Sequence, residues 1–474
     1  MSEKHYIACD LGAESGRVIL GRLADGKLQL EEVHRFANQV VRIQDSMRWN
    51  LLGIYEELKQ GLRKVADRNM PVASLSVDSW GVDYVLLNKQ QPMLSLPYHY
   101  RDSRSELPYE QALQQVGREL IFDKTGIQFM AINTLYQLMA EMKENPEVVG
   151  VADRFLNIAD YFNYLFSGVG CVEVSMASTT QLYNPKSQEW SAKLIQQFNM
   201  PEKIFPPIVE SGSKLGPLQQ ELCAETGLAD IDVVATCSHD TGAAVAAVPA
   251  EGEGWAYLSS GTWSLIGVEL PQPLIHEAVR EHNFTNEVGL ANTTRFLKNI
   301  VGLWLLQESR RAWLRQGLEL DYAEINRLAA EAEPFRSQID PDDPRFLSPQ
   351  DMPAEIVAYC LENSQPAPET PGQFARCILE SLAQLYNQYL NELEQLTDQK
   401  ITRLHIVGGG SQSKLLNQFT ANATGRTVLT GPVEATAIGN LLIQAMALGD
   451  IGSREELRQV VRNSFEIETY EPQN

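Results

Sequence analysis

The stretch Tyr6–Leu20, YIACDLGAESGRVIL, decides the fold of this 474-residue chain. Two apolar runs flank a short polar turn that is made of small and hydroxyl residues. Such a turn between two strands can point its backbone N–H groups at an anion, although an ordinary hairpin has the same composition. We therefore expect a phosphate-binding hairpin at Asp10–Arg17.

A second turn of the same kind lies about half a chain further on. Ser259–Ser264, SSGTWS, again separates two apolar runs, WAYL and SLIGV, and Ser238-His239-Asp240-Thr241 lies shortly before it. Recurrence of a pattern of this length suggests a second copy of the same layered unit. Two such turns could form a phosphate clamp.

Length and composition limit the classes of protein that the chain can represent. At 474 residues the chain exceeds the size of a single hydrophobic core, so we expect two domains, residues 1–245 and 246–474. A net charge of -22 argues against an extended nucleic-acid surface. We found neither a signal-peptide pattern nor a run of eighteen apolar residues, and we expect a cytoplasmic protein without membrane, nucleic-acid or obligate protein partners.

The order of the expected elements is that of an α/β protein. Three strands are expected over residues 5–36, and a helix over 52–66 precedes a strand over 74–87. A strand leads through His239 into a short helix of small residues, and two longer helices are expected over 298–316 and 374–396. A last strand ends at Gly408-Gly409-Gly410, where a ligand could approach the backbone closely.

The six cysteines predict reduced thiols, because they lack C-x-x-C spacing. Cys360 and Cys377 lie on two neighbouring expected helices and could meet. Packed thiols are the favoured interpretation of this pair.

Asp240 is the candidate general base for phosphoryl transfer to a hydroxyl. Alone it could simply cap the helix that follows, but an ionised carboxylate near a phosphate site can accept the proton of an attacking alcohol. We assign the neighbouring His239 to hydroxyl binding, with a buried structural histidine as the alternative.

The remaining candidates follow from residue type. Asp10 could hold Mg²⁺ through water, and Arg17 could contact phosphate oxygens or form an ion pair. Thr262 offers an N–H and a hydroxyl to a phosphoryl group. The segment Asp78–Asp83, DSWGVD, suits a polyol that packs on an indole, and Asn299 could cap a helix or bind substrate.

Ten ordered motifs along essentially the whole chain resemble the FGGY carbohydrate kinases, and among them the branch that acts on L-rhamnulose. They are DLGAESGR, DSWGVDY, YRDSR, GIQF, NTLYQL, SHDT, YLSSGTWSL, LKNIVGLWLLQ, LHIVGGG and GPVEA. The resemblance implies two α/β domains of the actin and Hsp70-like (ribonuclease H-like) ATPase type flanking a deep interdomain cleft. It further implies transfer of the γ-phosphate of ATP to O1 of L-rhamnulose in L-rhamnose catabolism, with Mg²⁺ required.

The same resemblance assigns roles to individual positions. It makes Asp240 the proton acceptor, Asp10 a metal-associated residue, residues 1–245 the sugar domain with the first phosphate turn, and residues 246–474 the nucleotide domain. Positions implied for ATP are Ala13, Glu14, Ser15, Gly16, Arg17, Thr262, Gln307 and Gly409, and those implied for the sugar are Gly81, His239, Asp240, Thr241 and Asn299. Glu14 departs from the smaller residue that is common at this turn, so contacts there should come from the backbone.

Two rival functions stay open at this point. The first is a kinase for another ketose, such as L-fuculose or xylulose. The second is an actin-like or chaperone-like ATPase switch, which would consume ATP whether or not a sugar is present.

Overall fold

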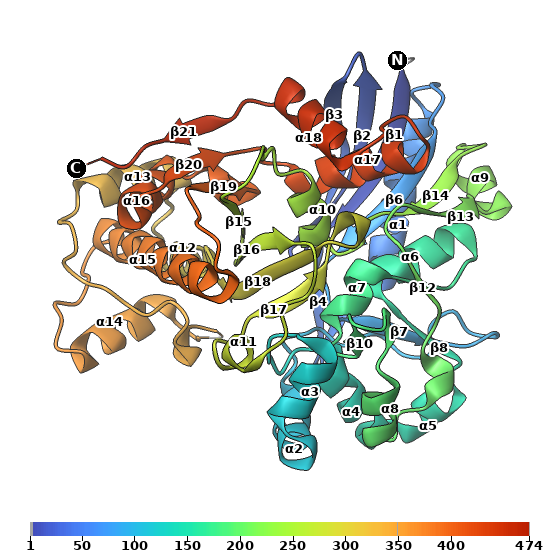
Figure 1. The fold of residues 1–474 in the computed structure, drawn as a ribbon, viewed down its shortest axis with the longest axis horizontal. Helices are drawn as coiled ribbons and strands as arrows, with labels where there is room; N and C mark the ends of the chain where they lie inside the picture. Colours follow the sequence, from blue (N-terminus) through green and yellow to red (C-terminus); the bar gives the residue numbers. More distant parts are fainter. Residues whose placement is uncertain (1–2, 348, 474) are drawn as a thin grey trace. The chain divides into compact units, whose positions relative to one another are not determined.

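The computed structural model describes residues 3–347 and 349–473, which form two compact units (Figure 1). The first unit contains the chain up to Ala247, together with Glu269–Phe296 and Ala435–Ser464. The second unit contains Val248–Val268, Leu297–Glu434 and the chain from Phe465 onward. The expected α/β architecture in two domains is therefore observed.

The path of the chain between the units differs from the single break that we expected near residue 245. The chain leaves the first unit after Ala247, but two later segments return to it. Packing explains one of these returns, because Gly439 of α17 (Ala435–Ala447) lies directly against Ala243 of α10 (Asp240–Ala246). Small residues on both helices allow this close approach, which hydropathy alone does not reveal.

The first unit is built on a six-stranded sheet in the order β13-β14-β6-β1-β2-β3. Its strands are β1 (Lys4–Leu11), β2 (Ser15–Ala24), β3 (Lys27–Ala37), β6 (Ser74–Ser79), β13 (Ser213–Pro217) and β14 (Asp232–Ala235). The paired short strands are β4 (Val40–Ile43) with β5 (Ser46–Trp49), β7 (Tyr84–Leu87) with β8 (Arg154–Asn157), β9 (Val172–Glu173) with β12 (Ile208–Val209) and β10 (Tyr183–Asn184) with β11 (Glu189–Trp190).

The first unit also contains helices. Besides α10 and α17 they are α1 (Leu51–Ala66), α2 (Glu106–Val116), α3 (Arg118–Thr125), α4 (Thr134–Glu144), α5 (Pro146–Val151), α6 (Ile158–Ser167), α7 (Val174–Thr179), α8 (Ala192–Gln197), α9 (Gln220–Thr226), α11 (Glu277–Glu281) and α18 (Arg454–Ser464). Of these helices, α1, α6, α17 and α18 pack on this sheet. Ile7, Cys9 and Leu11 of β1 belong to the same buried cluster as the apolar residues of α1 and α6. The alternate residues of β1 therefore point to the opposite face, which α17 covers (Figure 1).

The second sheet has the order β17-β18-β16-β15-β19-β20-β21. Its strands are β15 (Trp255–Ser260), β16 (Trp263–Leu270), β17 (Thr285–Val288), β18 (Thr294–Val301), β19 (Arg403–Val407), β20 (Thr427–Thr430) and β21 (Glu468–Tyr470). The helices of the second unit are α12 (Trp304–Arg315), α13 (Tyr322–Glu331), α14 (Met352–Glu362), α15 (Pro371–Thr397) and α16 (Lys414–Thr424).

The predicted recurrence of one layered unit is confirmed by strand pairing. β1 pairs with β2 antiparallel and with β6 parallel. β15 pairs with β16 antiparallel and with β19 parallel. Each unit thus places a hairpin turn beside the carboxyl end of a parallel strand, the edge at which ligands bind in open α/β sheets.

Two expected elements are wrong. The strand over residues 74–87 is two strands, because the chain turns at Trp80–Asp83, where Val82 has a φ of 65°. The helix over 298–316 begins only at Trp304, because Lys298–Val301 completes β18. Asn299 therefore lies in a strand and cannot cap this helix.

The thiols of Cys360 on α14 and Cys377 on α15 are both free and buried. Hydrogen bonding to Cys377 lowers the pKa of Cys360, so the two thiols are in contact. The favoured interpretation of packed thiols is confirmed.

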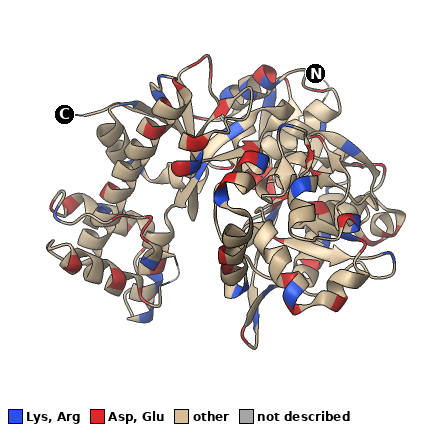
Figure 2. Cartoon of the chain, turned by 60° about the horizontal axis from the view of Figure 1, so that its bottom comes forward, with Lys and Arg blue, Asp and Glu red and all other residues tan. Residues whose placement is uncertain are grey.

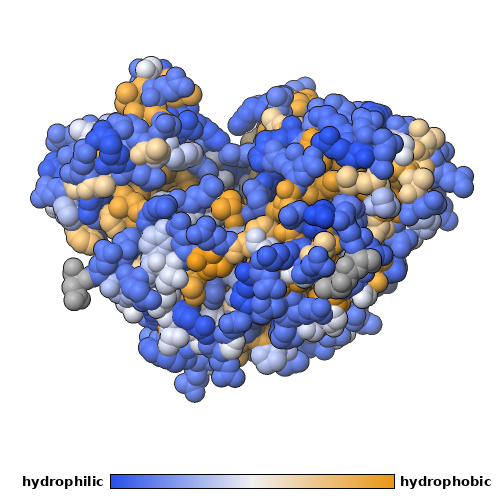
Figure 3. All heavy atoms as spheres, turned by 90° about the horizontal axis from the view of Figure 1, so that it is seen from above, coloured by the Kyte–Doolittle hydropathy of each residue, from blue (hydrophilic) through white to orange (hydrophobic). Residues whose placement is uncertain are grey.

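Charged and hydrophobic residues are distributed as expected for an acidic globular protein. Lys and Arg lie among Asp and Glu over the elements in Figure 2, and the face drawn in Figure 3 is mainly hydrophilic. Among the described residues, every helix is too short or too polar to span a membrane.

Candidate active site

The carboxyl edge of the first sheet gathers three carboxylates. Asp10 of β1 and Asp78 of β6 are register partners in parallel strands, so their side chains share one face of the sheet. Ser79 forms a β-bridge with His239, which places Asp240 beside the same edge. Burial and the charges of Asp10 and Asp240 raise the pKa of Asp78 well above its usual value.

Asp240 is the first residue of α10, and its side chain is 30% exposed. Its Oδ1 accepts hydrogen bonds from the N–H of Thr241 at 2.6 Å and from the Thr241 hydroxyl at 3.2 Å. Burial raises the pKa of Asp240, while His239 and Thr241 oppose that rise. A carboxylate that is reachable and has a raised pKa can serve as a proton acceptor.

Glu173 holds the segment that presents His239 and Asp240. This buried carboxylate accepts hydrogen bonds from the N–H of Ser238 at 2.9 Å and from the hydroxyl of Ser175. The same Ser175 hydroxyl accepts a hydrogen bond from the N–H of His239 at 3.1 Å. The sequence gives no signal for Glu173, because 65 residues separate it from Ser238.

The turn between β1 and β2 is closed by backbone hydrogen bonds. The Gly12 N–H donates to the Ser15 carbonyl at 2.9 Å. Asn38 donates from its own N–H to the Glu14 carbonyl and from its side-chain amide to the Gly12 carbonyl. Glu14 is exposed, while Ala13 and Ser15 are half-buried. Backbone groups of this turn are therefore fixed in place before any ligand binds.

Two predicted residues of this hairpin already have internal partners. Arg17 donates a short hydrogen bond to Asp10, its register partner across the strands, so the ion-pair alternative for Arg17 is observed. Gly16 is buried, and a Cβ there would lie 2.2 Å from the ring of Phe36. Packing against Phe36 thus requires glycine at this position.

Residues of the DSWGVD segment differ in role: Gly81 stays a candidate for the substrate site, whereas Asp83 has a structural role. Gly81 is half-buried, and a Cβ added at this position would lie 3.1 Å from the side chain of Thr179 in α7. Asp83 instead is buried, and its carboxylate accepts hydrogen bonds from Trp49, Trp80, Gln137 and the N–H of Tyr100. The rings of Trp80 and Trp49 pack in a tilted arrangement with their centroids 4.1 Å apart. The expectation that Asp83 binds a polyol is therefore wrong, because its carboxylate is buried and satisfied inside the protein, while packing of a sugar on the Trp80 ring stays a prediction.

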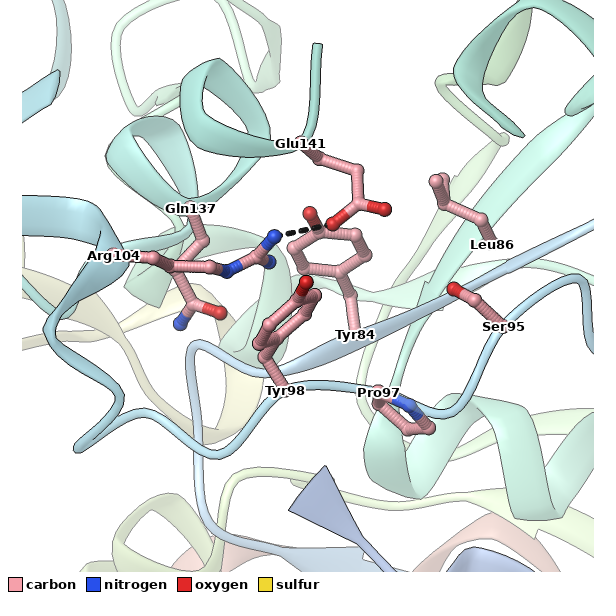
Figure 4. Close-up of a pocket in the computed structure, with 8 residues that line it drawn as sticks. All are labelled: Tyr84, Leu86, Ser95, Pro97, Tyr98, Arg104, Gln137 and Glu141. Carbon is pink, nitrogen blue, oxygen red and sulfur yellow. Dashed lines mark hydrogen bonds and ion pairs between the residues drawn. The ribbon is translucent and has the colours of Figure 1, made fainter. Parts of the chain in front are cut away.

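A small polar cavity lies behind this cluster (Figure 4). Its lining includes Tyr84, Tyr98, Gln137 and the buried ion pair between Arg104 and Glu141. Its volume of about 10 Å³ accommodates about one water molecule. It is too small for a sugar.

The second unit contains the other predicted nucleotide residues. Two backbone hydrogen bonds fix the turn Ser260–Thr262. The Gly261 carbonyl accepts from the Leu303 N–H at 3.0 Å, and the Thr262 carbonyl accepts from the Gly302 N–H at 3.2 Å. A Cβ on Gly302 would lie 2.7 Å from the Gly261 carbonyl, so only glycine fits there. Thr262 thus lies on a fixed turn beside the start of α12.

Gln307 and Gly409 have the features that an added ligand requires. The Oε1 of Gln307, on α12, is buried and has no hydrogen-bond partner among the described residues. Gly409 is exposed, and a Cβ there would meet no described atom within 4 Å. Gly408 and Gly410 on either side pack tightly against Ser260.

The set of predicted residues is divided between the units. Asp10, residues 13–17, Gly81 and residues 239–241 belong to the first unit, while Thr262, Asn299, Gln307 and Gly409 belong to the second. Asn299 is half-buried in β18, and its sugar contact stays a prediction.

The described residues contain no ready-made metal cage of three or more His, Cys, Asp or Glu ligands. Mg²⁺ typically takes one or two carboxylates and completes its shell with water and phosphate oxygens. The Oδ1 of Asp78 is buried without a hydrogen-bond partner among the described residues, next to Asp10. This pair of carboxylates fits such a partial site.

Comparisons with known proteins agree with this geometry. Residues 5–247 match the N-terminal domain, and residues 256–448 the C-terminal domain, of the FGGY family of carbohydrate kinases. The chain is 43% identical to the rhamnulokinase of Bacteroides thetaiotaomicron over 472 residues, covering 100% of this chain and 96% of that protein. It is 40% identical to the rhamnulokinase of Bacillus subtilis over 472 residues, covering 99% and 96%.

Solved structures show the same fold at low identity. The gluconate kinase from Lactobacillus acidophilus aligns with a TM-score of 0.82 at 16% identity, covering 100% of this chain and 94% of that one. Plasmodium falciparum glycerol kinase with ADP aligns with a TM-score of 0.80 at 15% identity, covering 99% and 94%. Two repeated hairpin units with a carboxylate at the sheet edge, both family domains and full-length relatives lead to one conclusion: the chain is an enzyme that belongs to the FGGY family of carbohydrate kinases.

Proposed function

We propose that this kinase transfers the γ-phosphoryl group of ATP to O1 of L-rhamnulose, giving L-rhamnulose 1-phosphate and ADP in L-rhamnose catabolism. Identities of 38–43% to seven rhamnulokinases over nearly the full chain support the choice of sugar. The observation that carries the chemistry is Asp240, a reachable carboxylate with a raised pKa at the carboxyl edge of the first sheet.

In the proposed mechanism, Asp240 accepts the proton of the O1 hydroxyl while the bond from O1 to the γ-phosphorus forms and the bond to ADP breaks. His239, Thr241, Gly81 and Asn299 bind the ketose. The hairpin at Ala13–Arg17 and Thr262 bind phosphates, while Gln307 and Gly409 bind the rest of the nucleotide. Asp10, with Asp78, would hold Mg²⁺ through water, and the metal would neutralise charge on the β- and γ-phosphates.

We further propose that the enzyme works in the cytoplasm on small molecules. Six free cysteines support a reducing compartment. The acidic composition supports small-molecule substrates over nucleic acid.

The test is an ADP-release assay with MgATP and a panel of L-rhamnulose, L-fuculose and xylulose. We expect kcat/KM to be highest for L-rhamnulose and ADP release to require a sugar. A higher kcat/KM with another ketose would show that this ketose, and not L-rhamnulose, is the substrate. ATP consumption without any sugar would favour an ATPase switch.

A substitution tests the proposed base. Asp240→Asn should lower kcat by about a hundredfold or more and leave nucleotide affinity nearly unchanged, because a positioned base contributes about that much. Asp67→Asn, at an exposed position after α1, is the matched control and should keep full activity. Normal turnover by the Asp240 variant would remove the residue from this role.

A further inference from the structure

Arg295 lies outside the predicted site and is fully buried in the first unit. Its Nε donates a hydrogen bond to the Val288 carbonyl at 3.2 Å. Its Nη2 lies 3.1 Å from Oε2 of Glu287 and 3.2 Å from Nδ1 of His239. The guanidinium is therefore held rigidly against the ring of a predicted substrate residue.

The two ring nitrogens of His239 face different charges. Nδ1 faces Arg295 and also lies 3.2 Å from Oε2 of Glu287, while Nε2 lies 3.3 Å from Oδ1 of Asp240. A neutral imidazole carries one proton, and the hydrogen bond at one nitrogen decides which nitrogen holds it. The identity of the proton-bearing nitrogen therefore decides whether His239 presents an N–H or a lone pair to Asp240.

A comparison of the two tautomers decides between them. With the proton on Nε2, Nδ1 accepts from Arg295 and the positive end of the Nε2–H bond lies 3.3 Å from Oδ1 of Asp240, so both contacts are electrostatically favourable. With the proton on Nδ1, an N–H faces the guanidinium N–H groups, and the lone pair of Nε2 faces a carboxylate. Arginine has donors only and stays protonated, so it cannot adapt. Glu287 favours the second tautomer, but its ion pair with Arg295 weakens that preference.

We propose that Arg295 is a positioning residue that keeps the proton of His239 on Nε2 and thereby places a polar N–H, rather than a lone pair, beside Oδ1 of Asp240. Two hydrogen bonds converge on Oδ1 of Asp240, from the N–H and the hydroxyl of Thr241, and the polar Nε2–H of His239 lies beside the same oxygen at 3.3 Å. Oδ2 is left as the oxygen that accepts the alcohol proton. This inference rests on the proposed role of Asp240.

The direct test is ¹⁵N NMR of the full chain labelled at its seven histidines, with His239→Asn used to assign the resonance. We expect the Nε2–H tautomer in the unmodified protein and in Glu287→Gln. Arg295→Met should place a proton on Nδ1, as the neutral Nδ1–H tautomer or as an imidazolium between two carboxylates, because Glu287 then faces Nδ1 alone. An Nδ1–H tautomer in the unmodified protein, or an unchanged spectrum in a folded Arg295→Met variant, would overturn the proposal. If Arg295→Met fails to fold, the unmodified protein and Glu287→Gln still decide the question.

Kinetics supply the second readout. Arg295→Met should lower kcat roughly tenfold to a hundredfold, as loss of an orienting partner usually does, without changing KM for MgATP. The matched control is Arg458→Met, which removes another buried arginine of the first unit, one paired with Glu269. The control should leave both the tautomer and kcat unchanged. An equal loss of kcat in both variants would overturn a specific role for Arg295.

The two proposals fail separately. Full turnover by Asp240→Asn would remove the catalytic role of Asp240 and leave the tautomer measurement valid. An Nδ1–H tautomer combined with an inactive Asp240→Asn variant would leave the proposed function intact and refute the role of Arg295.

Discussion

Single residues in the first unit show how burial decides whether a polar side chain stabilises the fold or stays available to a substrate. Asp83 is buried, which raises its pKa to about 6, and four donors satisfy its carboxylate. Asp240 is only part-buried, and its known donors gather on one oxygen. A carboxylate with an oxygen still available can take a proton from substrate, whereas a saturated one organises the protein around it.

His99 should make the fold sensitive to acid. Burial lowers its pKa to about 3, and its ring stacks on Trp49 at 4.2 Å. The unfolded chain binds this proton below about pH 6.5 while the folded chain does not, so this part of the stability is lost as pH falls from 6.5 toward 3. Between pH 7 and pH 5 the loss should be roughly 2 kcal/mol.

Urea unfolding at several pH values measures this effect. His99→Gln should reduce the loss of stability between pH 7 and pH 5, because glutamine binds no proton. His276→Gln, at an exposed histidine, is the control and should follow the unmodified protein. Parallel pH profiles for His99→Gln and the unmodified protein would show that His99 is not the acid-sensitive group.

At the scale of elements, α17 supports the site although it comes from the last tenth of the chain. Asn440 donates to Asp78 at 2.6 Å, and Gln444 donates to the Ile7 carbonyl of β1 at 2.9 Å. The same helix packs on α10, which begins at Asp240. One helix therefore contacts the end of β6, the middle of β1 and the helix that begins at the proposed base.

Gly439→Ala should disturb this support. A Cβ at this position would lie 1.9 Å from the Ala243 carbonyl, so α10 and α17 would have to separate. We expect a loss of roughly 1–3 kcal/mol in unfolding free energy, as is usual for overpacking, and a fall in kcat as Asp240 moves. Thermal unfolding and the ADP-release assay measure the two effects.

Gly150→Ala is the matched control for this substitution. Gly150 lies in α5, where a Cβ would meet no described atom within 4 Å. It should be neutral or slightly stabilising, since alanine is the better helix former. Equal unfolding free energies for the Gly439 variant and the unmodified protein would refute the packing argument.

At the scale of the whole molecule, the two units divide the proposed ligands. The sugar residues other than Asn299 lie in the first unit, whereas Gln307 and Gly409 lie in the second. Both units repeat the same hairpin and parallel strand, and the proposed base Asp240 lies in the first unit. We therefore expect the repeated topology to carry two different binding functions.

Gly409→Val should separate these functions. The position is open, so valine should leave the fold intact while blocking nucleotide approach. In the unmodified protein, either ligand at a hundred times its Kd should add about 2.7 kcal/mol of stability. The variant should lose the response to ADP and keep the response to L-rhamnulose in thermal-shift measurements. Gly150→Val should keep both responses, and an undiminished ADP response in the Gly409 variant would place the nucleotide elsewhere.

The sequence by itself determined the local elements and the repeat. Turn residues and apolar runs act over a few positions, so they predicted the hairpin at Asp10–Arg17, its second copy at Ser259–Ser264 and the helices α1 and α15 correctly. They failed at Trp80–Asp83 and at Asn299, where a turn and a strand depend on partners distant in sequence.

Only the tertiary structure decided which polar groups share a site. Glu173, Glu287, Arg295 and Asn440 lie up to several hundred residues from their partners, and burial, rather than residue type, gives each of them its role. Spacing along the chain does not record such contacts, because hydrogen bonds and charge interactions depend on distance in space.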